Sequence, residues 1–486
     1  ATAARTQSAS DRPATYREVF GVGEYRAVFT ASVLSWIGDY FAKVAIAYLI
    51  FSDTGSVLYS AAAFAISYLP WVAGGPVLAA LAERYPYRRV MILCDLVRMS
   101  LVALLAIPGT PLPALLALLF IASMLTPPAQ SARSALIPRL LKGDRYVVGL
   151  SVQATAAQAA QVSGYAAGGV LSAAVNPRAA LLVDATTFAL SALVIWRGVK
   201  PRPAAMGPEH RSHLLRETAE GFRVVFGNPV MRPIAFVVFA LVSVVIVPEG
   251  LAAGWSEDMG GGAWRAGLLM ASLPLGYVAG AVVVGRIMAP STRLKLIRPL
   301  ALLTPLVLIP ALADPPFPVV IAIAVAAGFA NSAIMPLNGL FVQVLPNAYR
   351  ARAFGIMQGG MQILHAVAVL VTGAIAEWFK VPIVVGAWSA VGLLLILLAV
   401  SAWPSPTVID EQIAHAAVTN QRDVAHQSDS HPPEAGDAAE AAEAAPSPAA
   451  TVSQPDHVDV DAGKGGNGKA SATGPNHPHE GETVRL

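Results

Sequence analysis

Cysteine and charge are both scarce in this sequence. The 486 residues include one cysteine, Cys94, so no disulfide can form within the chain and paired-cysteine redox chemistry is excluded. Only 13% of the residues are charged, whereas 55% are hydrophobic and the mean hydropathy is +0.58. A soluble domain of this length needs more polar surface. The composition therefore predicts a membrane protein.

Signatures of pumps, hydrolases and metal sites are also missing. The sequence has no P-loop, no H-E-x-x-H pair and no paired-carboxylate or nucleophile motif. ATP-driven pumping and membrane hydrolysis therefore lack support. Most histidines lie beyond residue 404, but their spacing is too loose for metal ligands. We expect no enzyme activity, no cofactor and no metal ion.

Long hydrophobic runs are what the sequence has in abundance. Each approaches the ~20 residues that a helix needs to cross ~30 Å of hydrocarbon. Barrel strands would be shorter and would alternate in polarity, so the sequence predicts an all-α membrane protein with twelve transmembrane helices. The expected spans are 28–51, 57–80, 90–107, 112–129, 147–175, 179–196, 234–253, 266–288, 296–312, 318–340, 354–378 and 383–403.

Basic residues indicate how the helices are oriented, because Lys and Arg accumulate in cytoplasmic loops. With the N-terminus inside, only Arg178, Arg265 and Lys380 fall in exterior loops. Both termini are therefore predicted to be cytoplasmic, and the membrane to be the cell membrane. The basic loops suit anionic lipid rather than nucleic acid.

Composition also divides the chain into segments. Residues 1–26 hold scattered acidic residues, so we expect a cytoplasmic lead-in and not a cleavable signal. Six-helix halves are predicted over 27–197 and 233–403, joined by a basic cytoplasmic linker over 198–232. Residues 404–486 are acidic, rich in Ala, Pro, Gly and Ser, and poor in large apolar residues. That composition predicts a disordered tail.

Two pairs of similar segments suggest that the halves are related by an internal repeat. SYLPWVAGGPV, from Ser67, resembles ASLPLGYVAGAVV, from Ala271. TPPAQSARSALIPRLL, from Thr126, resembles IMPLNGLFVQVLPNAYR, from Ile334. Shared prolines at a steady offset favour a repeat of six helices. Chance similarity between apolar helices is the alternative.

The sequence resembles the major facilitator superfamily (MFS). It is most similar to the branch of drug/proton antiporters that contains macrolide-efflux and enterobactin-exporter proteins. The loop signature of that family, G-x-L-A-D-R-x-G-R-K/R, is matched in part by LAERYPYRRV from Leu81, with glutamate for aspartate and proline for the second glycine. The resemblance implies a cytoplasmic latch whose residues are Glu83, Arg84, Arg88, Asp95 and Arg98. Alternatively, these charges only set the topology.

A second resemblance concerns the fifth predicted helix. The antiporter signature G-P-x-x-G-G corresponds to GYAAGG, which contains Gly164, Gly168 and Gly169 but has tyrosine in place of proline. The resemblance implies antiport. Ordinary close packing between helices explains the small residues equally well.

Polar residues inside the spans are candidates for a transport path, because they are costly in lipid. Asp39 and Lys43 lie four residues apart, so they share a helix face. Apolar surroundings favour a neutral Asp39 and Lys43 favours a charged one, which predicts proton coupling through this pair. Asp184 and Glu249 are expected near exterior helix ends, at the membrane interface, and are secondary candidates. The remaining candidates for the substrate cavity are Trp36, Gln158, Gln161, Asn331, Asn338, Gln358, Gln362 and His365.

These predictions together describe a monomeric secondary transporter that works by alternating access. The resemblance implies proton-coupled export of an amphipathic or hydrophobic small molecule, such as a drug, a macrolide or a siderophore. Import or facilitated passage of a small metabolite stays open, since fold does not fix function. A membrane-bound enzyme or a lipid-handling scaffold is the alternative of another class. Each single amide could also serve only in hydrogen bonding between helices.

Overall fold

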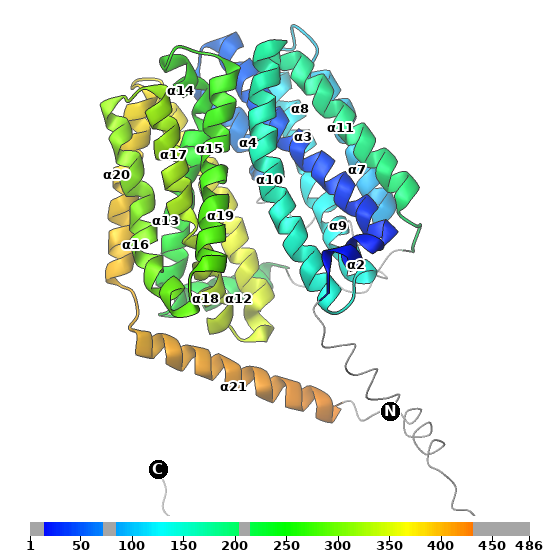
Figure 1. Ribbon diagram of the computed structural model, residues 1–486, viewed down its shortest axis with the longest axis vertical. Coiled ribbons are helices and arrows are strands. Elements are labelled where there is room, and N and C mark those ends of the chain that lie inside the picture. Colours follow the sequence, from blue (N-terminus) through cyan, green and yellow to red (C-terminus); the bar gives the residue numbers. More distant parts are fainter. Residues whose placement is uncertain (1–13, 71–83, 204–213, 431–486) are drawn as a thin grey trace, which may run out of the picture. The chain divides into compact units, whose positions relative to one another are not determined.

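The computed structural model describes residues 14–70, 84–203 and 214–430 (Figure 1). The chain divides into one compact unit over Ala1–Val424 and another over Ala425–Leu486. Within the described ranges every regular element is a helix, which confirms the all-α prediction. Glu83, part of the predicted latch, and residues 431–486 of the predicted tail lie outside these ranges.

The helices that precede the linker form what we call the N-terminal bundle, α3 to α11. A short helix, α2, comes before it and packs through the buried side chain of Val19. The bounds are α2 Tyr16–Gly21, α3 Gly23–Thr54, α4 Val57–Ile66, α7 Tyr87–Leu105, α8 Leu112–Met124, α9 Thr126–Leu140, α10 Asp144–Ala174 and α11 Pro177–Gly198.

The helices that follow the linker form the C-terminal bundle, α13 to α20. Helix α12 leads into this bundle and α21 follows it. The bounds are α12 Leu214–Gly227, α13 Met231–Gly250, α14 Ala252–Asp258, α15 Ala263–Val282, η1 Val283–Ile287, α16 Pro290–Leu308, η2 Ile309–Ala313, α17 Phe317–Asn331, α18 Ile334–Val344, α19 Asn347–Ile375, α20 Val381–Ser401 and α21 Pro406–Ser430.

Nine helices in the described ranges are long and apolar enough to cross a membrane, judged by length and composition. The three other predicted spans coincide with α4, α7 and α10. Helix α4 is short and borders the gap at 71–83, α7 carries several charged residues, and α10 is interrupted by glutamine, serine and glycine. The count of twelve therefore stays a prediction.

Helix boundaries follow from local sequence. The Asn176 side chain accepts a hydrogen bond from the Ala179 amide at 2.7 Å, and Pro177 occupies the first turn of α11, where its missing N–H costs nothing. Helix α3 ends at Gly55, which adopts a φ of 69°, a left-handed conformation that terminates the helix. These caps fix where the long helices begin and end.

Two of the spans are broken at matching places. Helix α8 gives way to α9 at Leu125, and α17 gives way to α18 at Ser332. The repeated segments from Thr126 and Ile334 each begin the helix after the break. Prolines early in both segments lack the amide hydrogen that would continue the regular ladder, which accounts for the irregularity. This correspondence supports the predicted repeat.

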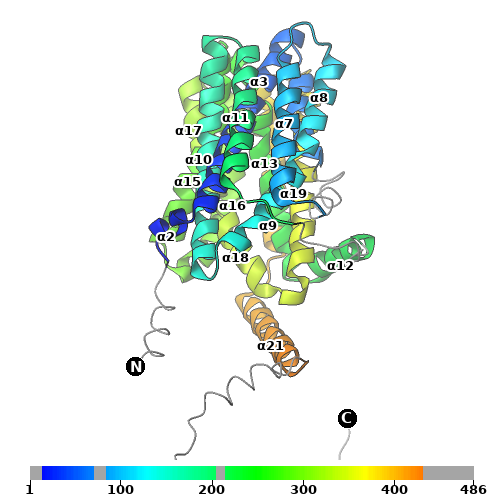
Figure 2. The same ribbon diagram turned by 90° about the vertical axis from the view of Figure 1, so that its right-hand side faces the viewer.

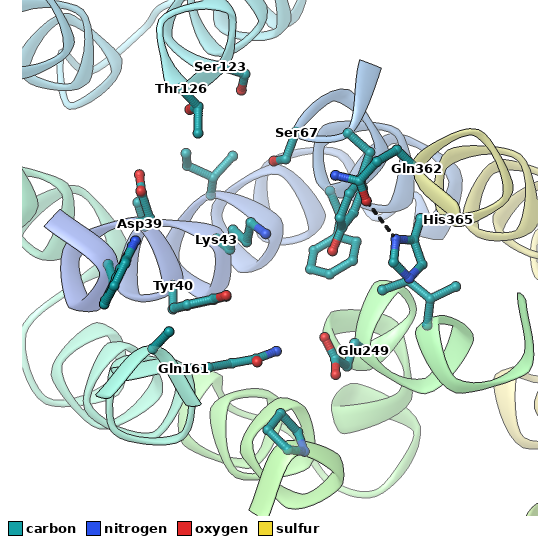
Figure 3. Close-up of a pocket in the computed structure, with 18 of the residues that line it drawn as sticks. Asp39, Tyr40, Lys43, Ser67, Ser123, Thr126, Gln161, Glu249, Gln362 and His365 are labelled. Carbon is teal, nitrogen blue, oxygen red and sulfur yellow. Dashed lines mark hydrogen bonds between the residues drawn. The ribbon is translucent and has the colours of Figure 1, made fainter. Parts of the chain in front are cut away.

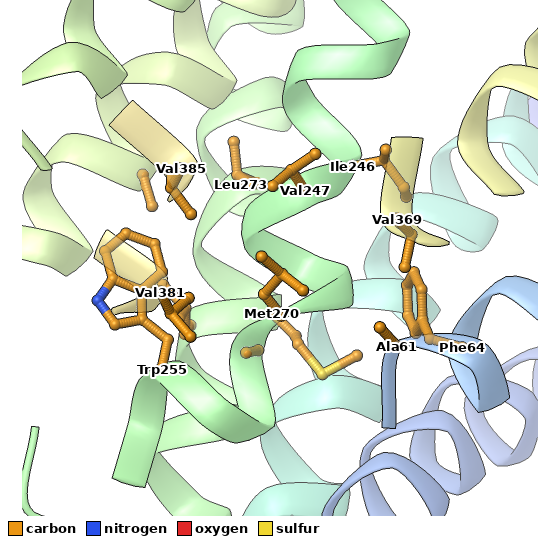
Figure 4. Close-up of a cluster of buried hydrophobic side chains, with 14 of the residues drawn as sticks. Ala61, Phe64, Ile246, Val247, Trp255, Met270, Leu273, Val369, Val381 and Val385 are labelled. Carbon is orange, nitrogen blue, oxygen red and sulfur yellow. The ribbon is translucent and has the colours of Figure 1, made fainter. Parts of the chain in front are cut away.

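The two bundles pack tightly at the end where α3 stops, which we call the Thr54 end. Tyr48 donates a hydrogen bond to Glu257 at 2.9 Å, and Ser56 donates one to Glu377 at 2.8 Å. The largest hydrophobic cluster also crosses between the bundles there, because Ala61 and Phe64 of α4 approach Val369 of α19 (Figure 4). Apolar burial and these hydrogen bonds hold the Thr54 end closed.

The opposite end, where α3 begins, is the Gly23 end. Helices α2, α12 and α18 all lie there in both views (Figures 1 and 2). Disorder from residue 404 was predicted, and this is wrong for the stretch that forms α21. Ile409 and Ile413 pack on the core of the C-terminal bundle and Ala416 is buried, so a short apolar stripe stabilises the helix.

Candidate functional site

A cavity of about 580 Å³ lies between the two bundles (Figure 3). Its walls come from the N-terminal bundle on one side and from the C-terminal bundle on the other. The contributing helices are α3, α4 and α7 to α11, and α13, α15, α17, α18 and α19. The predicted candidates that line it are Trp36, Asp39, Lys43, Gln158, Gln161, Asn331, Gln362 and His365.

Two predicted cavity residues lie elsewhere. Asn338 and Gln358 are exposed and do not line the cavity. The seven-residue spacing from Asn331 to Asn338 assumed one continuous helix, but the break at Ser332 rotates α18 relative to α17. Gln358 lies one turn nearer the start of α19 than Gln362, beyond the cavity wall. Helical periodicity therefore placed these two side chains incorrectly.

Asp39 pairs with a residue that sequence spacing did not indicate. Arg98 of α7 donates to its carboxylate, and the guanidinium also lies 4.3 Å from the centre of the Phe188 ring. Lys43 forms no ion pair with Asp39 among the described residues, and Figure 3 shows the two side chains diverging along α3. The expected pair within α3 is therefore wrong, because a neighbouring helix supplies a better-placed cation.

Lys43 instead points into a group of aromatic rings. Its ammonium lies 5.2 Å from the Tyr40 ring centre, 5.5 Å from that of Phe64 and 4.9 Å from that of Tyr68. Cation–π attraction in such a desolvated place is worth up to about 2 kcal/mol. The rings thus hold an ammonium in the cavity without neutralising its charge.

Glu249 faces the same space from the C-terminal bundle (Figure 3). Its carboxylate accepts a hydrogen bond from the Tyr165 hydroxyl of α10 at 3.2 Å, so this contact joins the bundles. Glu249 lies next to the end of α13, as expected, but its side chain is buried rather than exposed at the interface. The contact with Tyr165 depends on the packing of the two bundles, which no local pattern reveals.

Asp184 is the other acidic residue whose burial the sequence did not indicate. It is 1% exposed and lines the cavity from α11. One carboxylate oxygen accepts from the Thr187 hydroxyl at 3.1 Å, while Oδ2 has no hydrogen-bond partner in the described part of the chain. A Cβ at Gly38 would overlap Asp184, so this glycine lets α3 and α11 approach. The close approach of Gly38 to Asp184 depends on the tertiary structure and is not visible in the sequence.

The described residues of the predicted latch make contacts of different kinds in the structure. The buried carboxylate of Asp95 accepts from Ser191 of α11 at 2.6 Å, and Arg88 donates to the Trp196 carbonyl at 2.5 Å. Arg84 is exposed, and Arg98 belongs to the cavity through Asp39. Asp95 and Arg88 thus tie α7 to α11 inside one bundle. Their role as a latch stays a prediction.

The three glycines of the fifth predicted span form packing contacts. A Cβ at Gly164 would lie 2.8 Å from the Ile37 carbonyl oxygen, and one at Gly168 would lie 2.8 Å from that of Phe41. Gly169 faces α15, where a Cβ would lie 2.7 Å from Gly267 Cα. The geometry supports the packing alternative. The implied role in antiport stays a prediction.

Side chains that could bind a metal ion stay apart in the part of the chain that the structure describes. Across residues 14–70, 84–203 and 214–430, no three or more His, Cys, Asp or Glu side chains gather to hold an ion. The cavity instead combines buried charges, amides and aromatic rings. Such a site can bind a small molecule and can exchange protons through its carboxylates.

Solved transporter structures share this fold at low sequence identity. The nucleoside transporter NupG is 13% identical with a TM-score of 0.62, over 78% of this chain and 98% of its own. A peptide transporter POT in complex with sulfate is 14% identical with a TM-score of 0.62, over 85% of this chain and 99% of its own. No curated protein matches the sequence.

A family comparison agrees with the helical fold, the membrane-length helices and the central cavity. The model of the Major Facilitator Superfamily matches residues 28–314, which is more than half of the sequence. That family comprises membrane transporters, so the match indicates transport rather than enzyme catalysis. The chain therefore belongs to the Major Facilitator Superfamily.

Proposed function

We propose that this protein is a secondary active transporter in which two six-helix halves rock around the central cavity. The observation that carries the proposal is the cavity itself, which is lined from both bundles and contains charged side chains of membrane-length helices. In this proposal the Gly23 end and both termini face the cytoplasm, and the cell membrane holds twelve spans. The basic residues at the predicted cytoplasmic loops support that orientation.

The proposed substrate is a small amphipathic or hydrophobic molecule. A volume of about 580 Å³ is within the ~300–1,000 Å³ range of small-molecule pockets. Trp36, Tyr40 and Tyr68 offer apolar ring faces, while Gln158 and Gln161 offer amides. Mixed lining of this kind suits a molecule with a large apolar body and a few polar groups, as in a drug, a macrolide or a siderophore.

Proton coupling is proposed to run through Asp39 and its partner. Protonation of Asp39 would remove the charge that holds Arg98, and the freed guanidinium would then need another anion. Asp184 can supply it, since it lines the same cavity and its Oδ2 lacks a partner among the described residues. A shift of Arg98 between the two carboxylates would move α7 against α3 and α11.

Lys43 and Glu249 are proposed to respond to the binding of substrate in the cavity. They face the same cavity from opposite bundles, and the bond from Tyr165 to Glu249 lies on the closed side. A substrate that attracts either charge would change the electrostatic attraction between the two bundles, and with it the relative stability of the conformations open to each side. This extends the predicted coupling pair, Asp39 and Lys43, to groups on both bundles.

Export in exchange for protons is the direction we propose, and it rests on the resemblance to drug/proton antiporters. Import or facilitated passage of a small metabolite is the second candidate. The polar and charged lining favours it, since a hydrophilic solute also fits such a wall. The named structural neighbours transport nucleosides and peptides, but at 13–14% identity they establish the fold alone.

Proteoliposomes containing the purified protein test this function. We expect labelled substrate to exchange in counterflow and to accumulate when an opposing pH gradient is applied. Asp39→Asn should abolish accumulation but keep part of the counterflow, which needs no net proton movement. Asp53→Asn removes an exposed carboxylate at the end of the same helix and should leave both unchanged. Normal proton-driven accumulation in Asp39→Asn would refute the coupling role.

A further inference from the structure

A second groove lies on the outside of the C-terminal bundle, separate from the central cavity. It has a volume of about 580 Å³ and is formed by α13, α19 and α20. Phe236 and Leu395 are each 50% exposed and Leu398 is 68% exposed, so the groove opens onto the outer face. Apart from Ser243 and Arg232, its lining is entirely apolar. An apolar channel on a membrane-length surface suits a hydrocarbon chain.

The length of the groove matches one membrane leaflet. On α13 its lining extends from Arg232 to Ser243, which at ~1.5 Å per residue is about 16 Å. The hydrocarbon core is ~30 Å thick, so this is about half of it. Arg232 is the second residue of α13, at the Gly23 end. The groove therefore reaches from the membrane boundary to the middle of the bilayer.

Charge at the mouth of the groove is basic. Arg232 is exposed and is the only ionisable residue in the described lining, so no carboxylate neutralises it there. A cation at the mouth of an apolar channel favours a ligand with a negative head and a hydrocarbon tail.

Helix α12 borders the same end of the groove. Phe226 packs against Phe236 and Phe239 of the lining, with ring centres 5.9 and 6.3 Å apart. Tryptophan prefers the boundary between headgroups and hydrocarbon, and Trp403 follows the lining residue Ala402 at the same end of the groove. This tryptophan is consistent with a lipid headgroup at the level of Arg232.

We propose that this groove binds an anionic phospholipid, with an acyl chain along α13 and α20 and the headgroup phosphate at Arg232. Charge-assisted hydrogen bonds from a guanidinium to phosphate are among the stronger polar contacts. A zwitterionic lipid offers the same chain but no net negative charge. The proposal is independent of the transported substrate, because no residue of this groove lines the central cavity.

Native mass spectrometry of the purified full chain tests the proposal, by titration with phosphatidylglycerol and phosphatidylcholine of equal chain length. We expect the wild type to bind phosphatidylglycerol about fivefold more tightly, as expected for one basic residue near anionic lipid. Arg232→Gln should remove this preference, whereas Arg232→Lys should keep most of it. Arg286→Gln alters another exposed arginine at the Gly23 end, outside the groove, and should change nothing.

A groove-filling variant tests the place of the acyl chain. Ala402→Phe introduces a ring at an exposed lining position and should weaken binding of both lipids. Equal affinity of the wild type for the two lipids would overturn the proposal, as would an unchanged preference in Arg232→Gln. Displacement of bound lipid by inorganic phosphate alone would mean that the acyl chain is not held. A dimer that Ala402→Phe converts to monomer would make a second copy the occupant.

Discussion

The pair formed by Asp39 and Arg98 allows a direct test of the cavity. Breaking a fully buried ion pair by removing one partner costs about 3–5 kcal/mol, and an exposed pair contributes about 0–1 kcal/mol. The Arg98 side chain is 8% exposed and that of Asp39 is 25% exposed. We therefore expect Arg98→Gln to destabilise the fold by about 2 kcal/mol. Because the entropy of unfolding grows with chain length, a loss of this size lowers the thermal midpoint of the protein by about 2–3 °C.

A double-mutant cycle separates this pair from the one that sequence spacing suggested. The variant Asp39→Asn with Arg98→Gln should be more stable than the sum of its single effects predicts, by about 2 kcal/mol. Asp39→Asn combined with Lys43→Gln should be close to additive, because the Lys43 ammonium rests on aromatic rings. Thermal unfolding in one detergent measures all six proteins, which are the wild type, the three single variants and the two double variants. A larger coupling for Asp39 with Lys43 than with Arg98 would refute the structural pairing.

Three further predictions concern contacts between bundles and the α21 helix. Gly267→Ala places a Cβ 2.6 Å from Gly169 Cα and should lower the free energy of unfolding by about 1–3 kcal/mol. In the control Gly339→Ala the new Cβ meets open space, so this variant should be neutral or stabilising. Equal thermal midpoints for the two variants would contradict this expectation. Tyr165→Phe removes the hydrogen bond to Glu249 and should lower the free energy of unfolding by about 2 kcal/mol. An unchanged thermal midpoint would show that this hydrogen bond does not stabilise the fold. Deleting residues 431–486 should leave transport and the midpoint intact. Deleting 406–486 also removes Ile409 and Ile413 from the core and should lower the midpoint, and identical midpoints for the two truncations would show that α21 contributes nothing.

Much of the site was predictable where a helix stays continuous. Gln158 and Gln161 on α10, and Gln362 and His365 on α19, occur at helical spacing and line the cavity together. Their prediction needed only the cost of placing polar groups in lipid and the 3.6-residue turn. Asn338 failed under the same reasoning, because the break between α17 and α18 changed the face that it presents.

Electrostatic partners were not predictable, because they depend on which helices become neighbours. Sequence distance favoured Lys43 for Asp39, yet α7 brings Arg98 closer to it. Asp184 looked like an interfacial residue, but α11 packs so closely at Gly38 that its carboxylate is enclosed. No local signal marks these positions, apart from the general rule that a charge within a span needs a partner.

Composition and periodicity by themselves determined that the chain is helical, that it enters the membrane and which faces of its continuous helices are polar. These properties are local, since each depends on a window no longer than one helix and on the cost of exposing peptide groups to hydrocarbon. Only the tertiary structure decided the pairing of Asp39 with Arg98, the burial of Asp184 and Glu249, and the lipid-sized groove at Arg232. Those features arise where side chains from different helices meet, and the choice of neighbours depends on close packing between helices, which a one-dimensional pattern does not contain.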